Sequence, residues 1–228
     1  MHATGPGANF WGRLNEAEQT ALQALGRISV FRPGDTMCTQ GEPATHVFVL
    51  VNGWVKIFSV TSDGHEIVLA LRGRGDIVGE LAGEFTGYRT ATVKAIDLVR
   101  SLIIGHESFM SYLDSNPGAS RAYRHAVTQS WNDAAAILRS RWAASGAQRL
   151  AAVLLDLGYR HGTATESGIG IALPLSQEEI ASLIGASRAT VTRALRDWRR
   201  RGLVRTRQRH IMLIDIAGLR RIAGQEAR

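Results

Sequence analysis

The stretch that most constrains the fold of this chain is residues 175–204, LSQEEIASLIGASRATVTRALRDWRRRGLV. Ser176 and Glu179 have the spacing of a capping box, in which each side chain binds the other residue's backbone N–H, so a helix is expected to begin here. Gly185 allows a tight turn that other residues resist, and Ser187 has the side chain to cap a second helix. We therefore predict a short helix, a glycine turn and a second helix.

The second of these helices is predicted to have one apolar and one polar face. At helical spacing, Val191, Leu195 and Trp198 fall on the side that packs inward. The helix start and the opposite side carry the residues that we expect to face DNA: Ser187, Arg188, Ala189, Thr192, Arg193 and Arg196. This arrangement predicts a helix-turn-helix whose second helix enters the major groove of double-stranded DNA.

Arginine suits this task because its guanidinium can donate two hydrogen bonds to one guanine. Arg188 and Arg193 are therefore the candidates for reading bases. Thr192 is a candidate for a phosphate or a base edge, and Ala189 for a thymine methyl group. Residues 203–214 are predicted to form a β-hairpin, or wing. Phosphate contacts, which add affinity without sequence preference, are expected from Arg199, Arg205, Arg207 and Arg209.

Basic residues are concentrated at one end of the chain. Residues 1–144 hold 13 Lys and Arg against 13 Asp and Glu, whereas residues 145–228 hold 14 Arg against 7 Asp and Glu, which accounts for the whole net charge of +7. A neutral front and a basic back indicate two modules, of which the basic one meets a polyanion. A merely soluble basic face would give the same charge, so the DNA-binding prediction depends on the helix-turn-helix pattern.

The front part of the chain has the pattern of short strands. Apolar, β-rich runs separated by glycine-containing turns occur at residues 47–51, 54–60, 66–71, 90–96 and 99–104. Asn15 and Glu18 mark the start of a helix ahead of them. Many short strands with regular turns are typical of an antiparallel barrel or sandwich. The predicted fold class is α+β: an N-terminal antiparallel β-barrel, a long helix and a C-terminal winged helix-turn-helix.

A long helix is predicted to follow the strands, from about Pro117 to the break at Ser145. Its apolar residues recur every three or four positions, at Tyr123, Val127, Trp131, Ala134, Leu138 and Trp142. Pairing with the same helix of a second copy would bury this seam and make a homodimer through residues 116–144. Packing against the chain's own barrel is the alternative.

The predicted domains follow from these elements: residues 1–115 form a sensor barrel, residues 116–144 the dimerisation helix, and residues 145–228 the DNA-binding domain. Within the last of these, residues 147–157 are predicted to be helical because leucines recur on one side. The Gly- and Thr-rich residues 158–170 are expected to form a loop that leads into a short strand near residues 171–173.

A second chemical pattern lies between two of the predicted strands, in residues 75–96, GDIVGELAGEFTGYRTATVKAI. Backbone N–H groups at a helix start, together with Arg89, suit an anionic phosphate. The carboxylate of Glu80 can accept a hydrogen bond from a sugar hydroxyl. A plain salt bridge between Glu80 and Arg89 would account for the same two residues.

The sequences GELA at 79–82 and RTA at 89–91 resemble the phosphate-binding cassette of cyclic-nucleotide-binding domains. With the long helix and the QEEIASLIGASRATVTRAL stretch, nearly the whole chain resembles the Crp/Fnr family of bacterial regulators. The resemblance implies a jelly-roll barrel, a homodimer, an effector bound between barrel and long helix, and DNA-binding domains that reorient when it binds. The effector-binding residues it implies are Gly79, Glu80, Leu81, Ala82, Arg89, Thr90 and Ala91. Glu80 would contact the ribose, and Arg89 with Thr90 would hold the cyclic phosphate.

The chain departs from the cyclic-AMP receptors of this family at the end of the pocket that meets the base. Ala134 and Ala135 occupy the places where those receptors supply Thr and Ser to adenine, and Ser130 replaces a supporting arginine. Cyclic AMP and cyclic GMP are both candidate effectors, and a carboxylate such as Asp133 would suit guanine. On the DNA side, Ala189 replaces the family's usual glutamate, so a cytosine contact is missing and a different operator base is expected.

No metal, haem or iron–sulfur cluster is expected as a cofactor. The single cysteine, Cys38, cannot form an internal disulfide or hold a cluster by itself, and the histidines lack ligand spacing. Nothing in the sequence resembles a membrane span or a secretion signal, which predicts a cytoplasmic protein with no membrane partner. No catalytic residues are expected, because the sequence lacks paired acid and base carboxylates and a nucleophile elbow.

Other functions stay open on the sequence alone. A ligand-independent regulator could use the barrel as a scaffold, with a degenerate pocket. A nucleotide-sensing adaptor could bind protein through the basic end, and an enzyme could carry a nucleotide-binding barrel. If the chain is a dimeric regulator, its operator is expected to be near-palindromic, because two-fold symmetry presents two half-sites. RNA polymerase is then a candidate further partner.

Overall fold

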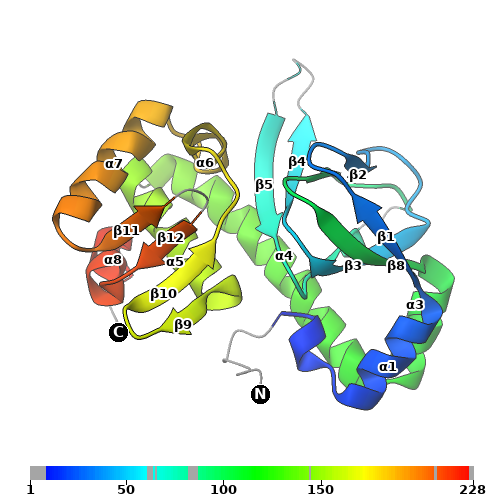
Figure 1. The fold of residues 1–228 in the computed structure, drawn as a ribbon. Coiled ribbons are helices and arrows are strands. Elements are labelled where there is room, and N and C mark those ends of the chain that lie inside the picture. The colour runs from blue at the N-terminus through cyan, green and yellow to red at the C-terminus, as the bar shows by residue number, and fades with distance from the viewer. Residues whose placement is uncertain are drawn as a thin grey trace. The chain divides into compact units, whose positions relative to one another are not determined.

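The computed structural model of the chain describes residues 9–60, 64, 66–81, 87–143, 145–207 and 210–225; for residues 136–143 it describes only the helical backbone. The chain divides into two compact units, residues 1–134 and 135–228, each of which is described by itself (Figure 1). The assignment of residues 1–115, 116–144 and 145–228 to sensing, dimerisation and DNA binding stays a prediction.

The N-terminal unit begins with a short 3-10 helix, η1 (Trp11–Arg13), and a capped helix, α1 (Glu16–Leu25). The predicted capping box of α1 is confirmed. The Glu18 N–H donates to Asn15 Oδ1 at 2.9 Å, and the Asn15 N–H donates to Glu18 Oε2 at 2.9 Å. Both bonds satisfy backbone donors that a helix start leaves without an intrahelical partner.

Strands of the N-terminal unit form two antiparallel four-stranded sheets. One sheet has the order β1-β8-β3-β6, from β1 (Arg27–Phe31), β8 (Val99–Gly105), β3 (His46–Asn52) and β6 (Ile77–Val78). The other has the order β2-β7-β4-β5, from β2 (Thr36–Cys38), β7 (Thr92–Ala95), β4 (Val55–Val60) and β5 (Glu66–Arg72). The predicted fold class is confirmed, although the predicted barrel consists of two separate sheets.

Strand β3 is apolar at successive positions because both faces of its sheet are covered. Phe48 and Leu50 join a core to which strands of both sheets contribute. Val47 and Val49 point the other way and pack in a second core with α1, α3 (His106–Ser115) and the first turns of α4 (Pro117–Ala143). The two cores hold the helices and the sheets of this unit together.

The apolar seam predicted for the long helix is divided in the structure. Tyr123 is buried in the core of its own unit, and Val127 packs against that core. Trp131 is 57% exposed, one further turn along α4. The side chains of Leu138 and Trp142 lie outside the described residues. The alternative of packing against the chain's own unit therefore holds for the beginning of α4, and the homodimer stays a prediction.

The C-terminal unit continues with α5 (Gly146–His161), which begins directly after the predicted break at Ser145 and one residue before the predicted start at 147. The expected loop at residues 158–170 is wrong. Helix α5 runs on to His161, and the Gly- and Thr-rich segment forms a hairpin of β9 (Thr163–Thr165) and β10 (Gly168–Ala172). These strands are completed by pairing of β10 with β12 (His210–Leu213), a partner distant in the sequence.

The rest of this unit contains α6 (Gln177–Leu183), α7 (Arg188–Arg200), β11 (Val204–Arg207) and α8 (Ile216–Ala223). Its sheet has the order β11-β12-β10-β9. As predicted, Val191, Leu195 and Trp198 are buried on one side of α7. Burial of this side directs the opposite side of the same helix to solvent. Within the described ranges, no helix is both long and apolar enough to cross a membrane.

Candidate functional sites

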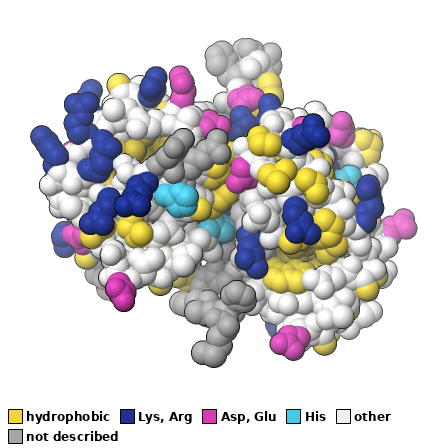
Figure 2. Space-filling model, viewed as in Figure 1, with side chains coloured by type: hydrophobic (Ala, Val, Ile, Leu, Met, Phe, Trp, Pro, Cys, Tyr) yellow, Lys and Arg dark blue, Asp and Glu magenta, His cyan; other side chains and the backbone are white. Residues whose placement is uncertain are grey.

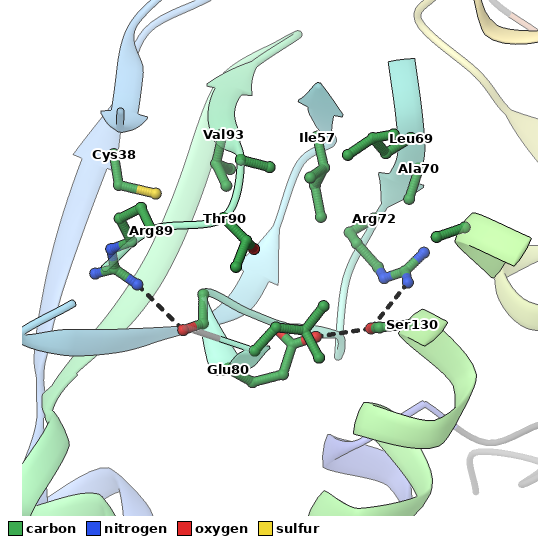
Figure 3. A pocket seen from close by; sticks show the side chains of 14 residues that line it. Cys38, Ile57, Leu69, Ala70, Arg72, Glu80, Arg89, Thr90, Val93 and Ser130 are labelled. Carbon is green, nitrogen blue, oxygen red and sulfur yellow. Dashed lines mark hydrogen bonds between the residues drawn. The ribbon is translucent and has the colours of Figure 1, made fainter. Parts of the chain in front are cut away.

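A pocket in the N-terminal unit collects most of the residues predicted to bind an effector (Figure 3). Six of the seven predicted residues line it: Gly79, Glu80, Leu81, Arg89, Thr90 and Ala91. The seventh, Ala82, lies outside the described residues. The remaining lining residues come from the strands and α4: Cys38, Ile57, Leu69, Ala70, Arg72, Val93, Ser130 and Ala134. The pocket thus has an apolar wall of strand side chains and a floor with charged groups.

Arg89 is fixed in place beneath this pocket. Its side chain is buried, with the residue 3% exposed, and its guanidinium donates to the carbonyl oxygens of Gly79 at 3.1 Å and His46 at 2.7 Å. The guanidinium carbon also lies 5.6 Å from the centre of the Phe48 ring. Since an arginine has five N–H donors, two carbonyl partners leave further donors for a phosphate. Because no carboxylate among the described residues pairs with this buried cation, an anionic ligand is a natural partner.

The glycine at position 79 is what allows Arg89 to lie there. Gly79 has a φ of +81°, which L side chains rarely adopt, and a Cβ at this position would overlap the Arg89 guanidinium. The same residue supplies the carbonyl that accepts from Arg89. Backbone conformation and side-chain packing thus both require glycine at this position.

Glu80 is buried and held by α4 at two points. Its Oε1 accepts a hydrogen bond from Ser130 Oγ at 2.7 Å, and its backbone carbonyl accepts from the Tyr123 hydroxyl at 3.2 Å. Burial raises the pKa of the Glu80 carboxyl, while the Ser130 hydrogen bond and the nearby charge of Arg72 lower it. Within the described residues, no ion pair joins Glu80 to Arg89, so the plain salt bridge considered from the sequence is not formed.

Arg72, at the end of β5, is a member of this site that the sequence analysis missed. Its Nη2 donates to Ser130 Oγ at 3.2 Å and forms an ion pair with Asp133 Oδ2 at 2.9 Å. Asp133 had been a candidate for binding a guanine base, and here it is engaged by Arg72. No local pattern marks Arg72, because its partners lie on a helix nearly sixty residues further along the chain.

The base end of the pocket carries few polar groups on α4. Ala134 lines the pocket, and Ala135 does not. Ser130, which replaces a supporting arginine, is instead the hydroxyl that links Arg72 to Glu80. Within the described part of the chain, no group of three or more His, Cys, Asp or Glu side chains is placed to hold a metal ion.

The second candidate site is the helix-turn-helix of the C-terminal unit, where the predicted caps are confirmed. The Glu179 N–H donates to Ser176 Oγ at 3.2 Å, and the Ser176 N–H donates to Glu179 Oε2 at 2.7 Å, which completes the capping box of α6. Gly185 in the turn has a φ of +59°. Ser187 Oγ accepts from the Thr190 N–H at 3.2 Å and starts α7.

An arginine that the sequence analysis did not single out holds this turn. Arg149 on α5 donates from Nε to the carbonyl of Ile184 at 2.6 Å and from Nη2 to the carbonyl of Gly185 at 3.0 Å. These carbonyls lie at the C-terminal end of α6, where a helix leaves acceptors unsatisfied. Arg149 thus fixes the angle at which α7 leaves the turn.

The solvent side of α7 presents most of the residues predicted to contact DNA. Ser187, Arg188, Ala189, Arg193, Arg196 and Arg199 are exposed. Among the described residues, no hydrogen bond or ion pair engages the side chains of Arg188, Arg193 or Arg196. Figure 2 shows basic side chains spread over this part of the C-terminal unit. Three unpaired guanidiniums on one helix form a surface suited to a polyanion.

Besides Ser187, whose hydroxyl caps α7, two further predicted DNA contacts have partners inside the unit. Thr192 is half-buried, and its hydroxyl lies 2.6 Å from Gln177 Oε1 and 2.9 Å from the Arg188 carbonyl oxygen, either of which can accept its single proton. Arg199 donates from Nη1 to Thr206 Oγ1 at 3.1 Å, which ties α7 to strand β11. Each of these two side chains can bind DNA only through donors or acceptors that these hydrogen bonds do not use.

The predicted wing is formed by β11 and β12, which pair antiparallel with Arg207 opposite His210. Arg205 and Arg207 are exposed on β11. Arg209 lies outside the described residues. Phosphate contacts from this hairpin therefore stay a prediction, supported by two exposed arginines on one strand.

Comparison with known proteins identifies both units. Residues 28–116 match the cyclic nucleotide-binding domain, and residues 148–222 match the Crp-like helix-turn-helix domain. The chain is 31% identical to the CRP-like cAMP-activated global transcriptional regulator of Mycobacterium tuberculosis, over 93% of this chain and 96% of that protein. The chain belongs to the Crp/Fnr family of transcription regulators. It is accordingly a DNA-binding regulator with a cyclic nucleotide-binding domain.

Other members of the family agree in length and fold. The cyclic AMP receptor protein of Thermus thermophilus is 25% identical over 94% of this chain and 95% of its own. The solved structure of FixK2 from Bradyrhizobium japonicum superposes with a TM-score of 0.77, at 22% identity, over 89% of this chain and 99% of that one. Family membership shows that the protein is a regulator of transcription and shows its fold. It does not identify its effector or its operator.

Proposed function

We propose that this chain is a homodimeric transcription regulator whose DNA binding is controlled by a 3′,5′-cyclic nucleotide in the pocket of the N-terminal unit. The observation that carries the proposal is that a buried arginine, Arg89, and a buried glutamate, Glu80, line one pocket without forming an ion pair with each other. Arg89 would hold the cyclic phosphate together with Thr90, and the Glu80 carboxylate would accept a hydrogen bond from the ribose. Gly79, Leu81, Ala82 and Ala91 would shape the loop around the ligand.

The remaining assignments extend this proposal to DNA. Arg188 and Arg193 would read bases in the major groove, because they are exposed and unpaired among the described residues. Arg196, Arg199 and the wing arginines would contact phosphates. The dimer would form through residues 116–144 and place two α7 helices about 34 Å apart, one turn of duplex, on a near-palindromic operator.

Three further assignments rest on family membership. We propose a cytoplasmic location, because a regulator of this family works where the chromosome is. RNA polymerase is the expected partner of the DNA-bound dimer. Cyclic AMP and cyclic GMP are the two ligands to try first, because relatives include proteins named as cyclic-AMP-dependent, whereas Ala134 at the pocket lacks a polar group for adenine.

Calorimetric titration of the purified chain with cyclic AMP and with cyclic GMP tests the effector. The matched variants are Arg89→Gln, in the pocket, and Arg100→Gln, an exposed arginine of β8. We expect binding by the wild-type chain and by Arg100→Gln, and a loss of at least tenfold in Arg89→Gln, because a charge-assisted phosphate contact is removed. A thermal unfolding scan of each variant shows that the loss comes from the site.

The alternative is a regulator of this family that binds DNA without an effector. Ala134 favours it, because in the described part of α4 this residue offers no polar group to the base of a nucleotide. Failure of the wild-type chain to bind either nucleotide, combined with sequence-specific DNA binding in their absence, would establish this alternative and overturn cyclic-nucleotide control.

A further inference from the structure

The feature of the N-terminal unit that the proposed function does not use is a buried chain of polar contacts beginning at Arg72 (Figure 3). Arg72 Nη2 donates to Ser130 Oγ at 3.2 Å, and Ser130 Oγ in turn donates to Glu80 Oε1 at 2.7 Å. The same guanidinium pairs with Asp133 at 2.9 Å, three residues further along α4. One arginine on a strand therefore contacts α4 twice and reaches the Glu80 carboxylate through a single hydroxyl.

Because these polar groups are buried, the loss of any one of their contacts would be energetically costly. Arg72 and Glu80 are each only 4% exposed, and a buried charge is costly unless it is paired and hydrogen-bonded. The groups that act on Glu80 are Arg72 from β5, Ser130 from α4 and Asp76 from the turn before β6. Arg72 and Ser130 lower the pKa of the Glu80 carboxyl, whereas burial and Asp76 raise it. Arg72 is thus the nearby cation that favours the carboxylate form.

The direction of the hydrogen bonds also fixes where the carboxylate points. Ser130 has one proton to donate, and it receives a bond from Arg72 while giving its own to Glu80. A guanidinium has no acceptor, so the relay can run only from Arg72 to Glu80. Arg72 is itself anchored by donation from Nη1 to the Leu71 carbonyl at 3.0 Å and by Asp133. The orientation of Glu80 therefore depends on a residue that lines the pocket on a different element.

We infer that Arg72 is a positioning residue for effector binding: through Ser130 it orients the Glu80 carboxylate to receive the ribose 2′-hydroxyl of a cyclic nucleotide. The inference rests on the proposed function. In a 3′,5′-cyclic nucleotide the 2′-hydroxyl is the one free hydroxyl of the ribose, so it reports directly on Glu80. A carboxylate has about four lone-pair sites, so the Glu80 carboxylate keeps acceptor capacity for this hydroxyl beside its bonds to Ser130 and to the backbone. Position 130 on α4 holds a serine, and the cation near Glu80 is Arg72, which lies on strand β5.

The test compares each nucleotide with its 2′-deoxy analogue, by calorimetry, on the full chain and its variants. The ratio of the two dissociation constants is the 2′-hydroxyl factor. For the wild-type chain we expect a factor of about 10 to 100, the range of a hydrogen bond to a charged group. In Arg72→Met, which keeps an unbranched apolar stem but removes the guanidinium and its donors, we expect the factor to fall below about three, because the acceptor is no longer oriented.

The matched control is Arg74→Met, the same substitution at an exposed position two residues away. It should keep the wild-type factor. Arg72→Lys, which retains a cation, should recover part of it. A merely structural role of Arg72 would weaken both the ribo and the deoxy ligand alike and leave their ratio unchanged. If thermal unfolding shows that Arg72→Met does not fold, Ser130→Ala removes the middle of the relay with little change in volume and should lower the factor in the same way.

The outcomes separate this inference from the proposed function. A wild-type chain that binds neither nucleotide overturns the proposed function and the inference with it. A wild-type chain that binds a nucleotide with a 2′-hydroxyl factor near one leaves effector control standing and overturns the role of Glu80 and Arg72. Wild-type binding with an unchanged factor in Arg72→Met, or in Ser130→Ala where that variant replaces it, overturns the role of Arg72 alone.

Discussion

The pocket of the N-terminal unit and helix α7 both depend on arginine, but the arginines are buried in the pocket and exposed on α7. In the pocket, Arg72 and Arg89 are buried and hold carbonyl, hydroxyl and carboxylate groups. On α7, Arg188, Arg193 and Arg196 are exposed and unpaired among the described residues. A buried and bonded cation is fixed before a ligand arrives, so it selects by geometry. An exposed cation acts at a distance on a polyanion and reads bases only on contact.

The largest effect that would test this contrast is expected on α7. The double variant Arg188→Ala with Arg193→Ala should weaken specific DNA binding by roughly 2–6 kcal/mol per half-site, because each bidentate contact to guanine contributes about 1–3 kcal/mol. The thermal midpoint should stay unchanged, since both side chains are exposed. Fluorescence anisotropy measures this with a site selected from random DNA by the wild-type chain, against unselected DNA of equal length.

The control for this prediction is the double variant Arg205→Ala with Arg207→Ala on the wing. It should weaken binding to both DNAs alike and reduce the steepness of log K against log salt by about 2 per half-site, because each of the two lost phosphate contacts removes about 0.9 from it. If the α7 variant still distinguished the selected site as the wild-type chain does, the base-reading role of Arg188 and Arg193 would be wrong.

A smaller effect is expected where a buried arginine depends on the backbone. Gly79→Ala should lower the free energy of unfolding by roughly 1–3 kcal/mol, because alanine is strained at its φ of +81°. The added Cβ would also displace Arg89, so cyclic-nucleotide affinity should fall as well. Gly41→Ala is the matched control: its φ is +87°, and nothing lies within 4 Å of the added Cβ. Urea unfolding and calorimetry should show a similar stability loss in both variants, with an affinity loss in Gly79→Ala only; equal affinities would contradict the packing argument.

The smallest effects should appear in the pH dependence of stability, where the two regions differ in sign. Burial raises the pKa of Glu80 above its ordinary value of 4.5, so the folded chain binds more protons at this carboxyl than the unfolded chain does. Stability therefore falls as the pH rises from about 4.5 through the higher pKa of the folded state. Hydrogen bonds from Arg200 and Arg201 lower the pKa of Asp197 below 3.8, so its contribution is present above that value and is lost as the pH falls through the folded pKa.

Glu80→Gln should therefore remove a decline in stability with rising pH, and Asp197→Asn should remove a smaller loss at acid pH. Denaturant unfolding of the two variants and the wild-type chain from pH 3 to 8 would show these changes. A Glu80→Gln variant that kept the wild-type pH profile would mean that the buried carboxyl titrates as it does in the unfolded chain.

The elements that could be predicted from sequence are those whose determinants are close together. The capping box of Ser176 and Glu179 spans three residues, and the turn at Gly185 depends on one backbone angle. The hairpin of residues 163–172 was missed because its glycines are poor strand formers, and its strands are completed by pairing of β10 with β12, about forty residues further on. Neighbouring residues carry no signal of such a partner.

The candidate sites divide in the same way. The cassette residues around Gly79 and Arg89 follow a short motif, so the sequence located the pocket. Arg72 and Arg149 carry no motif, and their bonds span 58 and 35 or 36 residues. Conversely, the sequence assigned Asp133 a possible base-binding role that its ion pair with Arg72 now competes with.

By itself, the sequence determined the order of elements, the helix caps, the apolar and basic faces of α7, and the family. These depend on residue type and on spacings of a few residues, which hydrogen bonds and helical periodicity make readable. Only the tertiary structure decided which of the arginines are buried and which groups each one contacts. Burial and pairing result from the packing of strands and helices that are distant in the chain. Because of this packing, Ser130 accepts a hydrogen bond from Arg72 and donates one to Glu80.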